Sequence, residues 1–399
     1  MNLVAILLLA LAAADDPKKA SPLAIGETFT VESKVLGEKR RINVYLPPGY
    51  ADAKAERFPV LYMPDGGVAE DFVHVAGLVQ VSVGNGTMRP FVLVGIENTV
   101  RRRDLTGPTE NANDKKIAPQ VGGSAAFRKF IRTELMPEVA ARYRTTKETA
   151  VVGESLAGLF VVETFFLEPD LFDTYLAVDP SLWWNDEKLV RDSTGWLRDN
   201  PQLSKKQLFL ASSGEKGIAE PTARLATEVV KFAPMRLRWH HEKMPHETHG
   251  TIFHPAALLA FRKMLRPVGD FSALVGEWHM KSFVANGKAM PAKDAAACRV
   301  VIDKDGTVAK YDGERHVVSG WITHADARKT PHEIEWELGG RSEFSGRFEP
   351  KYAQKGIFEV GKDTLKLCAT RDATQSPRPA AFESPVGKEL VLQEFVRVK

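Results

Sequence analysis

Thr149 to Gly158 reads T-A-V-V-G-E-S-L-A-G and is the most informative stretch of the chain. Its first four residues are apolar or β-branched, and a helical pattern follows directly from Leu159. A strand, a sharp turn with a central serine and then a helix are the layout of a nucleophile elbow. The sequence therefore predicts that Ser155 stands on a strained turn, with its hydroxyl raised above a sheet. The usual G-x-S-x-G pattern is nearly complete, because the small residue Ala157 replaces the second glycine.

The sequence around this turn alternates between buried strands and amphipathic helices. A helical face is predicted over Ala125 to Tyr143, and a closing helix over Pro255 to Leu265. Such alternation indicates an α/β fold with a mostly parallel sheet and helices on both faces. Ligands in such folds bind beyond the carboxyl ends of the strands. The predicted strands are Phe58 to Met63, Phe91 to Ile96, Tyr175 to Val178, Gln207 to Ala211 and Met235 to His241.

The pattern changes near Arg266-Pro267-Val268-Gly269, where short strands separated by turns replace the alternation. We therefore predict two domains, an α/β-hydrolase over residues 21–266 and an all-β domain over residues 268–399. The second domain is expected to be a barrel or sandwich without helices. If it is a barrel, we expect its own side chains to fill the interior.

The composition excludes some classes of protein. The 399 residues carry a net charge of only +3, so nothing indicates a nucleic-acid partner. Residues 1–14 form an apolar run ending in three alanines, which predicts a signal peptide and a secreted or periplasmic protein. This run is too short to span a membrane. Cys298 and Cys368 are predicted either to form one disulfide or to remain two thiols.

A serine nucleophile needs a base, because its hydroxyl is weakly nucleophilic at neutral pH. Among the histidines that follow the elbow, His249 lies in a loop before the closing helix and is the preferred base, with His246 next. The segment His246 to His249 superficially resembles a zinc motif. Its histidines are three residues apart instead of four, so we expect no metal site and no cofactor.

The carboxylate that would orient the imidazole is less well determined by the sequence. Glu215 and Glu220 both follow the strand that ends at Ala211, and Asp179 follows the strand before it. We favour Glu215, with Glu220 as the alternative and Asp179 as a weaker candidate. A dyad without an acid is also open, with a backbone carbonyl in its place.

An oxyanion hole needs two backbone N–H groups that point at the developing negative charge. The first is expected from Leu156, directly after the nucleophile. The second is expected from Gly66 or Gly67, in the loop after the strand Phe58 to Met63. Glycine in this loop permits a close approach of the backbone.

Several further segments resemble the putative esterase family, which includes esterase D and the ferric enterobactin esterases. The resemblance covers about residues 21–266 and implies that Ser155 is the nucleophile and His249 the base. It also implies that Trp183 and Trp184 line the substrate pocket. Arg103, in the cluster Arg101 to Arg103, suggests an anionic substrate. The segments are Leu61 to Gly66, Asn98 to Thr106, Gly153 to Phe160, Pro180 to Trp184 and His249 to Thr251.

Residues 268–399 resemble a small secreted domain family of planctomycetes that has a lipocalin-like pattern. The resemblance rests on Leu274 to Trp278, Asn286 to Lys288 and Gly356 to Cys368. It implies export and a small β-barrel, and it implies no activity.

Together these patterns predict a secreted serine hydrolase that cleaves small-molecule carboxylic esters through an acyl-enzyme, similar to a siderophore esterase. One alternative is an acyltransferase on the same fold, and another is a non-catalytic ligand-binding protein. The ester itself stays open between siderophore trilactones, carbohydrate-linked acyl groups and small thioesters.

Overall fold

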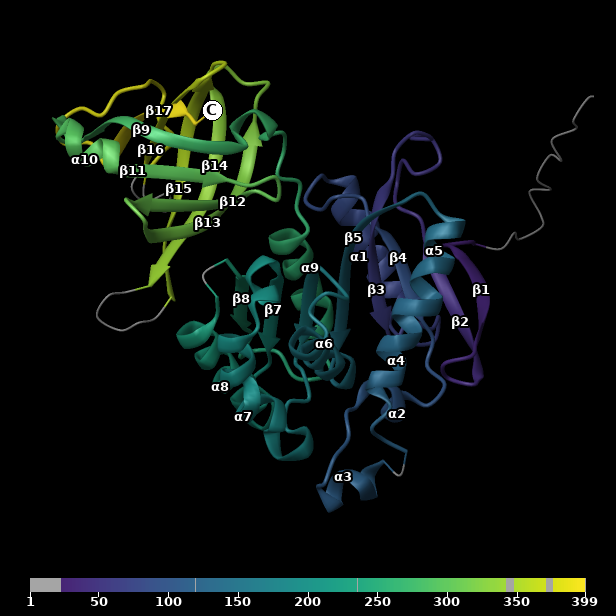
Figure 1. Cartoon of the computed structure of the whole chain (residues 1–399). Helices are drawn as coiled ribbons and strands as arrows, with labels where there is room; N and C mark the ends of the chain where they lie inside the picture. Colours follow the sequence, from purple (N-terminus) through teal and green to yellow (C-terminus); the bar gives the residue numbers. More distant parts are fainter. Residues whose placement is uncertain (1–22, 119, 235, 342–347, 371–375, 399) are drawn as a thin grey trace, which may run out of the picture.

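The computed structural model describes residues 23–118, 120–234, 236–341, 348–370 and 376–398. They form two domains, each built on its own sheet (Figure 1). The predicted fold class, an α/β-hydrolase followed by a small all-β barrel, is confirmed. The signal peptide predicted for residues 1–14 lies outside the described residues.

The first sheet has eight strands in the order β1-β2-β4-β3-β5-β6-β7-β8. Strands β1, β2 and β4 pair antiparallel, and all pairs from β4 to β8 across the sheet are parallel. The parallel strands are nearly continuous apolar runs, as expected for strands that helices cover on both faces. The strands are β1 Glu27–Ser33, β2 Glu38–Tyr45, β3 Phe58–Pro64, β4 Val92–Ile96, β5 Thr145–Glu154, β6 Thr174–Val178, β7 Gln207–Ser212 and β8 Arg238–Lys243.

Helices cover both faces of this sheet, and each face has its own apolar core. Helices α1 (Phe72–Gly84) and α9 (Phe253–Met264) pack on one face. The longer helices on the other face are α6 (Leu156–Leu167), α7 (Trp184–Asp199) and α8 (Lys216–Phe232). Shorter helical segments complete the domain: α2 Arg101–Leu105, α3 Ala112–Ile117, α4 Ser124–Phe130, α5 Met136–Arg142 and a 3₁₀ turn at Pro201–Lys205.

The helix predicted over Ala125 to Tyr143 is present but is interrupted by a π-helical turn at Ile131–Leu135. Pro137 follows this turn in the first turn of α5. Proline has no N–H to donate to the preceding turn, so the helix changes its hydrogen-bond pattern there. The predicted apolar face is nevertheless buried from Phe127 to Val139.

An ion-pair network inside the first domain holds strand β2 against helix α2. The side chain of Arg40 is buried and pairs with the buried carboxylate of Asp104 and with Glu38. Arg103 donates to the same two carboxylates, 2.7 Å from Asp104 and 2.8 Å from Glu38. Four charged groups are therefore held together at the edge of the core.

We expect Arg40→Met to lower the free energy of unfolding of this domain by about 3 kcal/mol, because the substitution leaves a buried carboxylate with fewer partners. Urea unfolding followed by circular dichroism measures the change. Lys39→Met is the matched control, since the neighbouring pair between Lys39 and Glu32 is exposed and should contribute little. Equal stability of both variants would show that the buried network does not stabilise the domain.

The second domain is an eight-stranded antiparallel barrel, closed by pairing between its first and last strands, β9 and β17. An additional two-residue strand, β10 (Lys288–Ala289), pairs with β9. Buried side chains such as Trp278, Trp336 and Phe358 fill the interior, in agreement with the expected filled core. The barrel strands are β9 Gly276–Ala285, β11 Cys298–Ile302, β12 Thr307–Asp312, β13 Arg315–Asp326, β14 His332–Arg341, β15 Phe348–Val360, β16 Thr364–Thr370 and β17 Leu390–Arg397.

The barrel domain departs from its prediction in one respect. It contains a short helix, α10 (Ala292–Ala297), and a 3₁₀ turn at Ser272–Leu274. Alanine has the highest helix propensity of any residue type, which explains a helix at the alanine run of α10. With only one turn and a half, this helix is too short to produce a clear periodic pattern in the sequence. Cys298 and Cys368 are both free thiols.

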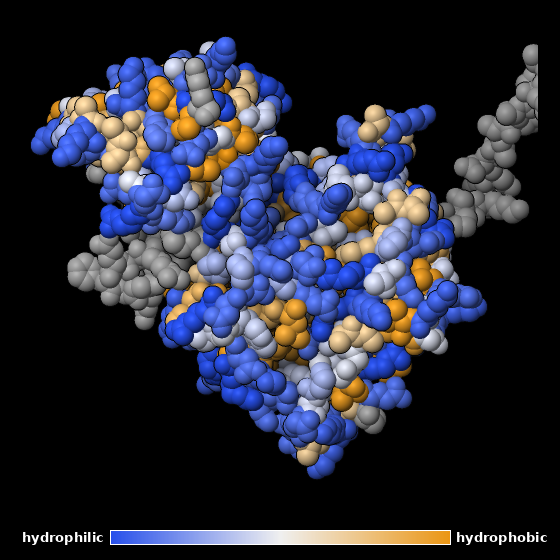
Figure 2. Space-filling view, in the orientation of Figure 1, coloured by the Kyte–Doolittle hydropathy of each residue, from blue (hydrophilic) through white to orange (hydrophobic). Residues whose placement is uncertain are grey.

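The two domains meet at the free edge of the first sheet. Strand β8 is the last strand of that sheet and lies next to the barrel, whereas β1 lies at the far edge (Figure 1). An ion pair between Arg236 and Asp303 crosses the junction. On the face shown in Figure 2, hydrophilic residues cover most of both domains, and hydrophobic residues form separate patches. Among the helices that the structure describes, none is sufficiently long and apolar to cross a membrane.

Candidate active site

Ser155 stands at the turn between β5 and α6, as the sequence predicts. Its backbone has φ 58° and ψ −119°, a strained conformation for a residue other than glycine. A Cβ atom at Gly153 would lie 2.7 Å from Ala157, so only glycine at that position lets strand and helix pass this closely. Tight packing beneath the turn therefore holds the Ser155 side chain at the carboxyl end of the sheet.

The structure brings His249 to Ser155, although 94 residues separate them in the chain. The Nε2 atom of His249 lies 3.0 Å from Oγ of Ser155. A second hydroxyl, Oγ of Ser181, lies 3.4 Å from the same Ser155 oxygen. The imidazole is only partly exposed, and its loop is tied to β7 by a hydrogen bond from the N–H of Gly214 to the carbonyl of Glu247.

The carboxylate that contacts the imidazole is Asp179, the weaker of the sequence candidates. Its Oδ2 atom lies 2.8 Å from Nδ1 of His249, and its Oδ1 atom accepts the N–H of Ser213 at 2.8 Å. Asp179 is fully buried and has φ 42°, directly after β6. Because an ionised carboxylate only accepts hydrogen bonds, Nδ1 carries the proton and Nε2 is free to accept one from Ser155.

The expectation that Glu215 or Glu220 orients the imidazole is corrected by these positions. Glu215 begins helix α8, and its carboxylate accepts the backbone N–H of His249 at 2.7 Å, so it holds the loop and not the ring. Glu220 is exposed on the same helix and lies 4.0 Å from Arg224. His246, the second choice for the base, is exposed in the loop.

The loop after β3 differs from the expected oxyanion site. The N–H of Gly66 donates to the carbonyl of Ile96 at 3.0 Å, so the ladder between the two strands already uses it. The N–H of Gly67 donates to the carboxylate of Glu70 at 2.6 Å. Leu156 is the first residue of α6, where the first N–H groups of a helix lack partners within the helix. Gly66 is thereby excluded as a donor, and Gly67 can donate to a substrate only after Glu70 moves.

The three predicted substrate-binding residues differ in their burial and in their partners. Trp184 is buried and donates its indole N–H to the carbonyl of Gly107 at 3.1 Å, which makes it part of the core. Trp183 is only partly buried and packs against that core. Arg103 is committed to the ion-pair network with Asp104 and Glu38, so the prediction that it binds substrate is corrected.

Arg101 is the member of the arginine cluster whose charge reaches the site. Its guanidinium donates two hydrogen bonds to Asp65, at 2.7 and 2.6 Å. Burial lowers the pKa of Arg101, but the hydrogen bonds to Asp65 and the charges of Asp71 and Glu154 outweigh it, so the net shift is upward. The sequence alone does not distinguish Arg101 from Arg102 and Arg103, because it does not show which side of a short helix faces a crevice.

Carboxyl groups shift the pKa values of Glu154 and His249, two titratable neighbours of Ser155. Burial is the main reason that the pKa of the adjacent Glu154 carboxyl is raised to about 7; the charge of His249 opposes this increase, and the negative charges of Asp71, Asp179 and Asp65 add to it. The hydrogen bond to Asp179 raises the pKa of His249, and burial partly opposes this, while the charge of Glu154 adds to the increase. The negative charge of Glu154 therefore favours the protonated form of His249, and the charge of protonated His249 favours ionised Glu154.

Comparisons with known proteins agree with the α/β-hydrolase fold. The chain is 24% identical over 289 residues to the ferri-bacillibactin esterase BesA of Bacillus subtilis, covering 67% of this chain and 87% of that protein. An IroE-like serine hydrolase from Shewanella oneidensis superposes with a TM-score of 0.54 at 29% identity, covering 60% of this chain and 80% of that one. The BES protein of Bacillus cereus shares the fold, with a TM-score of 0.55 at 20% identity over 63% of this chain and 98% of that one. The family model described as "Putative esterase" matches residues 33–233, about half of the sequence, and the chain therefore belongs to the putative esterase family.

Proposed function

We propose that this protein is an exported serine hydrolase that cleaves carboxylic esters through an acyl-enzyme intermediate. The observation that carries the proposal is the chain of contacts from Ser155 Oγ to His249 Nε2 and from His249 Nδ1 to Asp179, at 3.0 and 2.8 Å. Membership of the esterase family supports hydrolysis of an ester bond as the reaction class. The proposed nucleophile, base and acid are these three residues.

In the proposed mechanism Ser155 Oγ attacks the ester carbonyl carbon while His249 Nε2 accepts the hydroxyl proton. The same nitrogen then returns the proton to the leaving alkoxide, which departs as an alcohol and leaves an acyl ester on Ser155. Water attacks this ester and loses a proton to Nε2. The bond between the acyl carbon and Ser155 Oγ then breaks, Nε2 returns the proton to Oγ, and the acid is released. Asp179 holds the imidazole in the required tautomer and stabilises its charged form.

The negative oxygen of each tetrahedral intermediate needs hydrogen-bond donors. Leu156 N–H is the proposed first donor, in the position directly after the nucleophile. Gly67 N–H is the proposed second donor, once substrate displaces the carboxylate of Glu70 that now accepts its hydrogen bond. Displacement would release a donor next to the reacting carbonyl only when substrate is present.

For the substrate we propose an ester of the siderophore type, because the relative that aligns over most of its length is a ferri-bacillibactin esterase. Trp183, partly exposed next to the buried Trp184, is the proposed aromatic wall of the substrate crevice. Hydrolysis rates measured across siderophore trilactones, carbohydrate acyl esters and thioesters test this choice. Faster hydrolysis of either of the last two classes would reject it.

A fluorophosphonate probe tests the nucleophile directly. We expect one adduct per molecule, and peptide mass spectrometry should locate it on Ser155 and not on Ser181, whose hydroxyl is only 3.4 Å away. Ser181→Ala is the matched control and should still be labelled. Folded protein that takes up no label, or takes it up on Ser181, would refute the proposed role of Ser155.

The pH dependence of kcat/KM should depend on Glu154. Only neutral His249 can accept the proton, so activity should rise with pH through the raised pKa of His249, above its ordinary 6.5. Glu154→Gln removes a negative charge that raises this pKa, so the acid limb should move to lower pH. Pre-steady-state or steady-state rates from pH 5 to 9 measure the shift. An unchanged limb, or a shift to higher pH, would contradict the coupling.

A further inference from the structure

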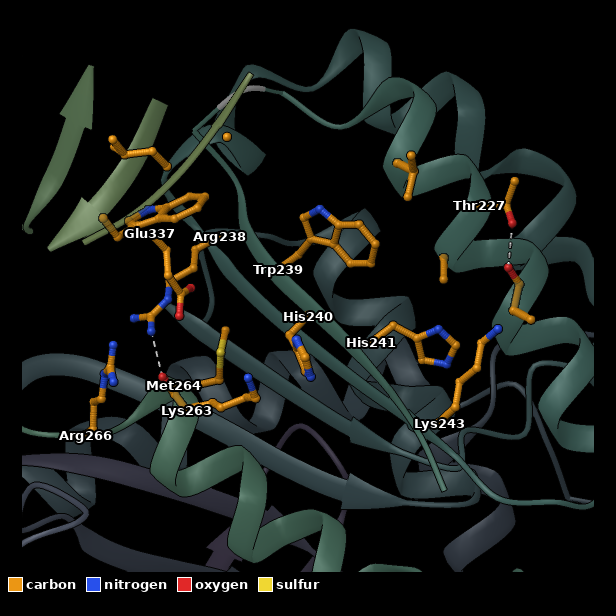
Figure 3. A pocket seen from close by; sticks show the side chains of 16 residues that line it. Thr227, Arg238, Trp239, His240, His241, Lys243, Lys263, Met264, Arg266 and Glu337 are labelled. Atoms are coloured by element: carbon orange, nitrogen blue, oxygen red, sulfur yellow. Dashed lines mark hydrogen bonds between the residues drawn. The ribbon is translucent and has the colours of Figure 1, made fainter. Parts of the chain in front are cut away.

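A cavity of about 550 Å³ lies between the two domains, away from the proposed catalytic residues. Strand β8, at the free edge of the first sheet, forms one side with residues from Arg238 to Lys243 (Figure 3). Helices α8 and α9 contribute further residues, and the barrel closes the cavity with Trp321, Glu337 and Leu338. Ser155, Asp179 and His249 are not among the residues that line it.

The cavity contains a buried arginine that lacks a close carboxylate. Arg238 is only 9% exposed, and its guanidinium donates to two uncharged oxygens, the Gln207 side chain at 3.3 Å and the Lys263 carbonyl at 2.6 Å. Burial is the main reason that its pKa is lowered to about 10; the charge of Glu337 opposes this shift, and the positive charges of Arg266 and Arg89 contribute to it. A buried cation is costly unless a negative group pairs with it.

Arg266 lies at the same end of the cavity (Figure 3) and likewise lacks a close carboxylate. Its Nε atom is buried and has no hydrogen-bond partner among the described residues. Glu337 acts on both arginines through its charge, and Glu335 acts on Arg266, yet within the described part of the chain neither arginine forms an ion pair with these carboxylates. The two arginines therefore line a common space in which nearby carboxylates only partly offset their charge.

The rest of the lining adds positive charge and aromatic surface. Lys243 and Lys263 also line the cavity, so its lining contains four cations from Lys and Arg and one carboxylate, Glu337. Burial lowers the pKa of His241 to about 4, which keeps that ring neutral. The indoles of Trp239 and Trp321 provide flat apolar walls from opposite domains. Aromatic rings favour stacked or edge-on contacts with a flat ligand.

We propose that this cavity binds an aromatic carboxylate, with the carboxylate on Arg238 and Arg266 and the ring between Trp239 and Trp321. A planar guanidinium fork matches a carboxylate in geometry and charge. The ligand would connect the edge of the hydrolase sheet to the barrel, which gives the second domain a role in binding. The proposal does not depend on the hydrolytic function of Ser155.

Arg238 and Arg266 could instead have a purely structural role, with Glu337 as their counter-ion. The two explanations predict opposite results for Glu337→Gln. If Glu337 serves as their counter-ion, Glu337→Gln should lower the melting temperature and create no binding. If the cavity is an anion site, the same variant removes a repulsive charge and should bind the carboxylate more tightly than the parent protein. The sign of this single change separates the two explanations.

Binding of 2-naphthoate to full-length Ser155→Ala protein, measured by calorimetry and tryptophan fluorescence, tests the proposal. We expect 2-naphthoate to bind at least about tenfold more tightly than neutral 2-naphthalenemethanol, and Arg266→Gln to remove about that factor. Arg191→Gln, at an exposed arginine on α7, is the matched control and should change nothing. Trp321→Leu should also weaken binding and provides a second test should Arg266→Gln fail to fold.

Four results would overturn the proposal. Equal affinity for the carboxylate and the neutral alcohol would show a merely apolar cavity. Unchanged binding in both Arg266→Gln and Trp321→Leu would place the ligand elsewhere. Binding abolished by prior fluorophosphonate labelling of the wild-type protein would locate it in the catalytic crevice, and tighter binding of naphthyl phosphate would reject a carboxylate as the preferred ligand.

Discussion

Replacing Ser155 with alanine is expected to lower kcat for an activated ester by about 10⁶-fold, the loss known for removal of a catalytic serine. Alanine has no oxygen to form the acyl-enzyme, so only binding and the oxyanion donors would remain. KM should change much less, because Ser155 makes its main contribution in the transition state. Steady-state kinetics with p-nitrophenyl esters, together with a burst-phase measurement on the wild-type protein, provide the test.

Ser181→Ala is the natural control for this prediction. Its hydroxyl lies 3.4 Å from that of Ser155, and its N–H donates to the Ser155 carbonyl at 3.0 Å. The backbone bond survives the substitution, so we expect only a small loss of activity. If Ser181→Ala were inactive and Ser155→Ala active, the nucleophile would be misassigned.

Asp179→Asn is expected to lower kcat on the order of 10⁴-fold, as the same change does in a serine-protease triad. The asparagine amide would no longer act as an acceptor-only partner, so the imidazole could present Nε2–H to Ser155 and lose its role as base. Because Asp179 also raises the pKa of His249, the remaining activity should have its acid limb at lower pH. Circular dichroism and the melting temperature would confirm that the buried site still folds.

Glu215→Gln is the matched control, because it neutralises the carboxylate that contacts the backbone of His249 instead of its ring. The amide oxygen can still accept that N–H, so the loop should stay in place. We expect kcat to fall by less than about tenfold, which corresponds to 1.4 kcal/mol. A larger loss in Glu215→Gln than in Asp179→Asn would return the role of acid to Glu215.

Much of the fold could be predicted from local patterns. Parallel strands such as β3 and β6 are short apolar runs bounded by turns, and these were recognisable directly. Helix α1 was not predictable in this way, because its many valines resemble a strand and it is apolar on most sides. Helix α7 is not predictable in this way either, because its first turn is irregular: after Trp184, residues Asn185, Asp186 and Glu187 all have positive φ.

The candidate site, like the fold, is only partly predictable from the sequence. Ser155 and His249 could be chosen from the sequence, because a strand–serine–helix turn and a histidine in the loop before the last helix are local features. The acid could not, since β6 and β7 are adjacent parallel strands and carboxylates follow both of them. Only the left-handed backbone of Asp179 and its full burial direct that carboxylate to the imidazole.

What the sequence by itself determined is the alternation of strands and helices, the strained serine turn and the change to an all-β domain near residue 267. These features depend on periodicity and on small residues at fixed spacing, both of which are properties of neighbouring residues. Only the tertiary structure decided that Asp179 faces His249, that Arg103 belongs to an internal ion-pair network, and that a cationic cavity lies beside β8. Those outcomes depend on which distant side chains share a buried space, and no local pattern encodes that distance.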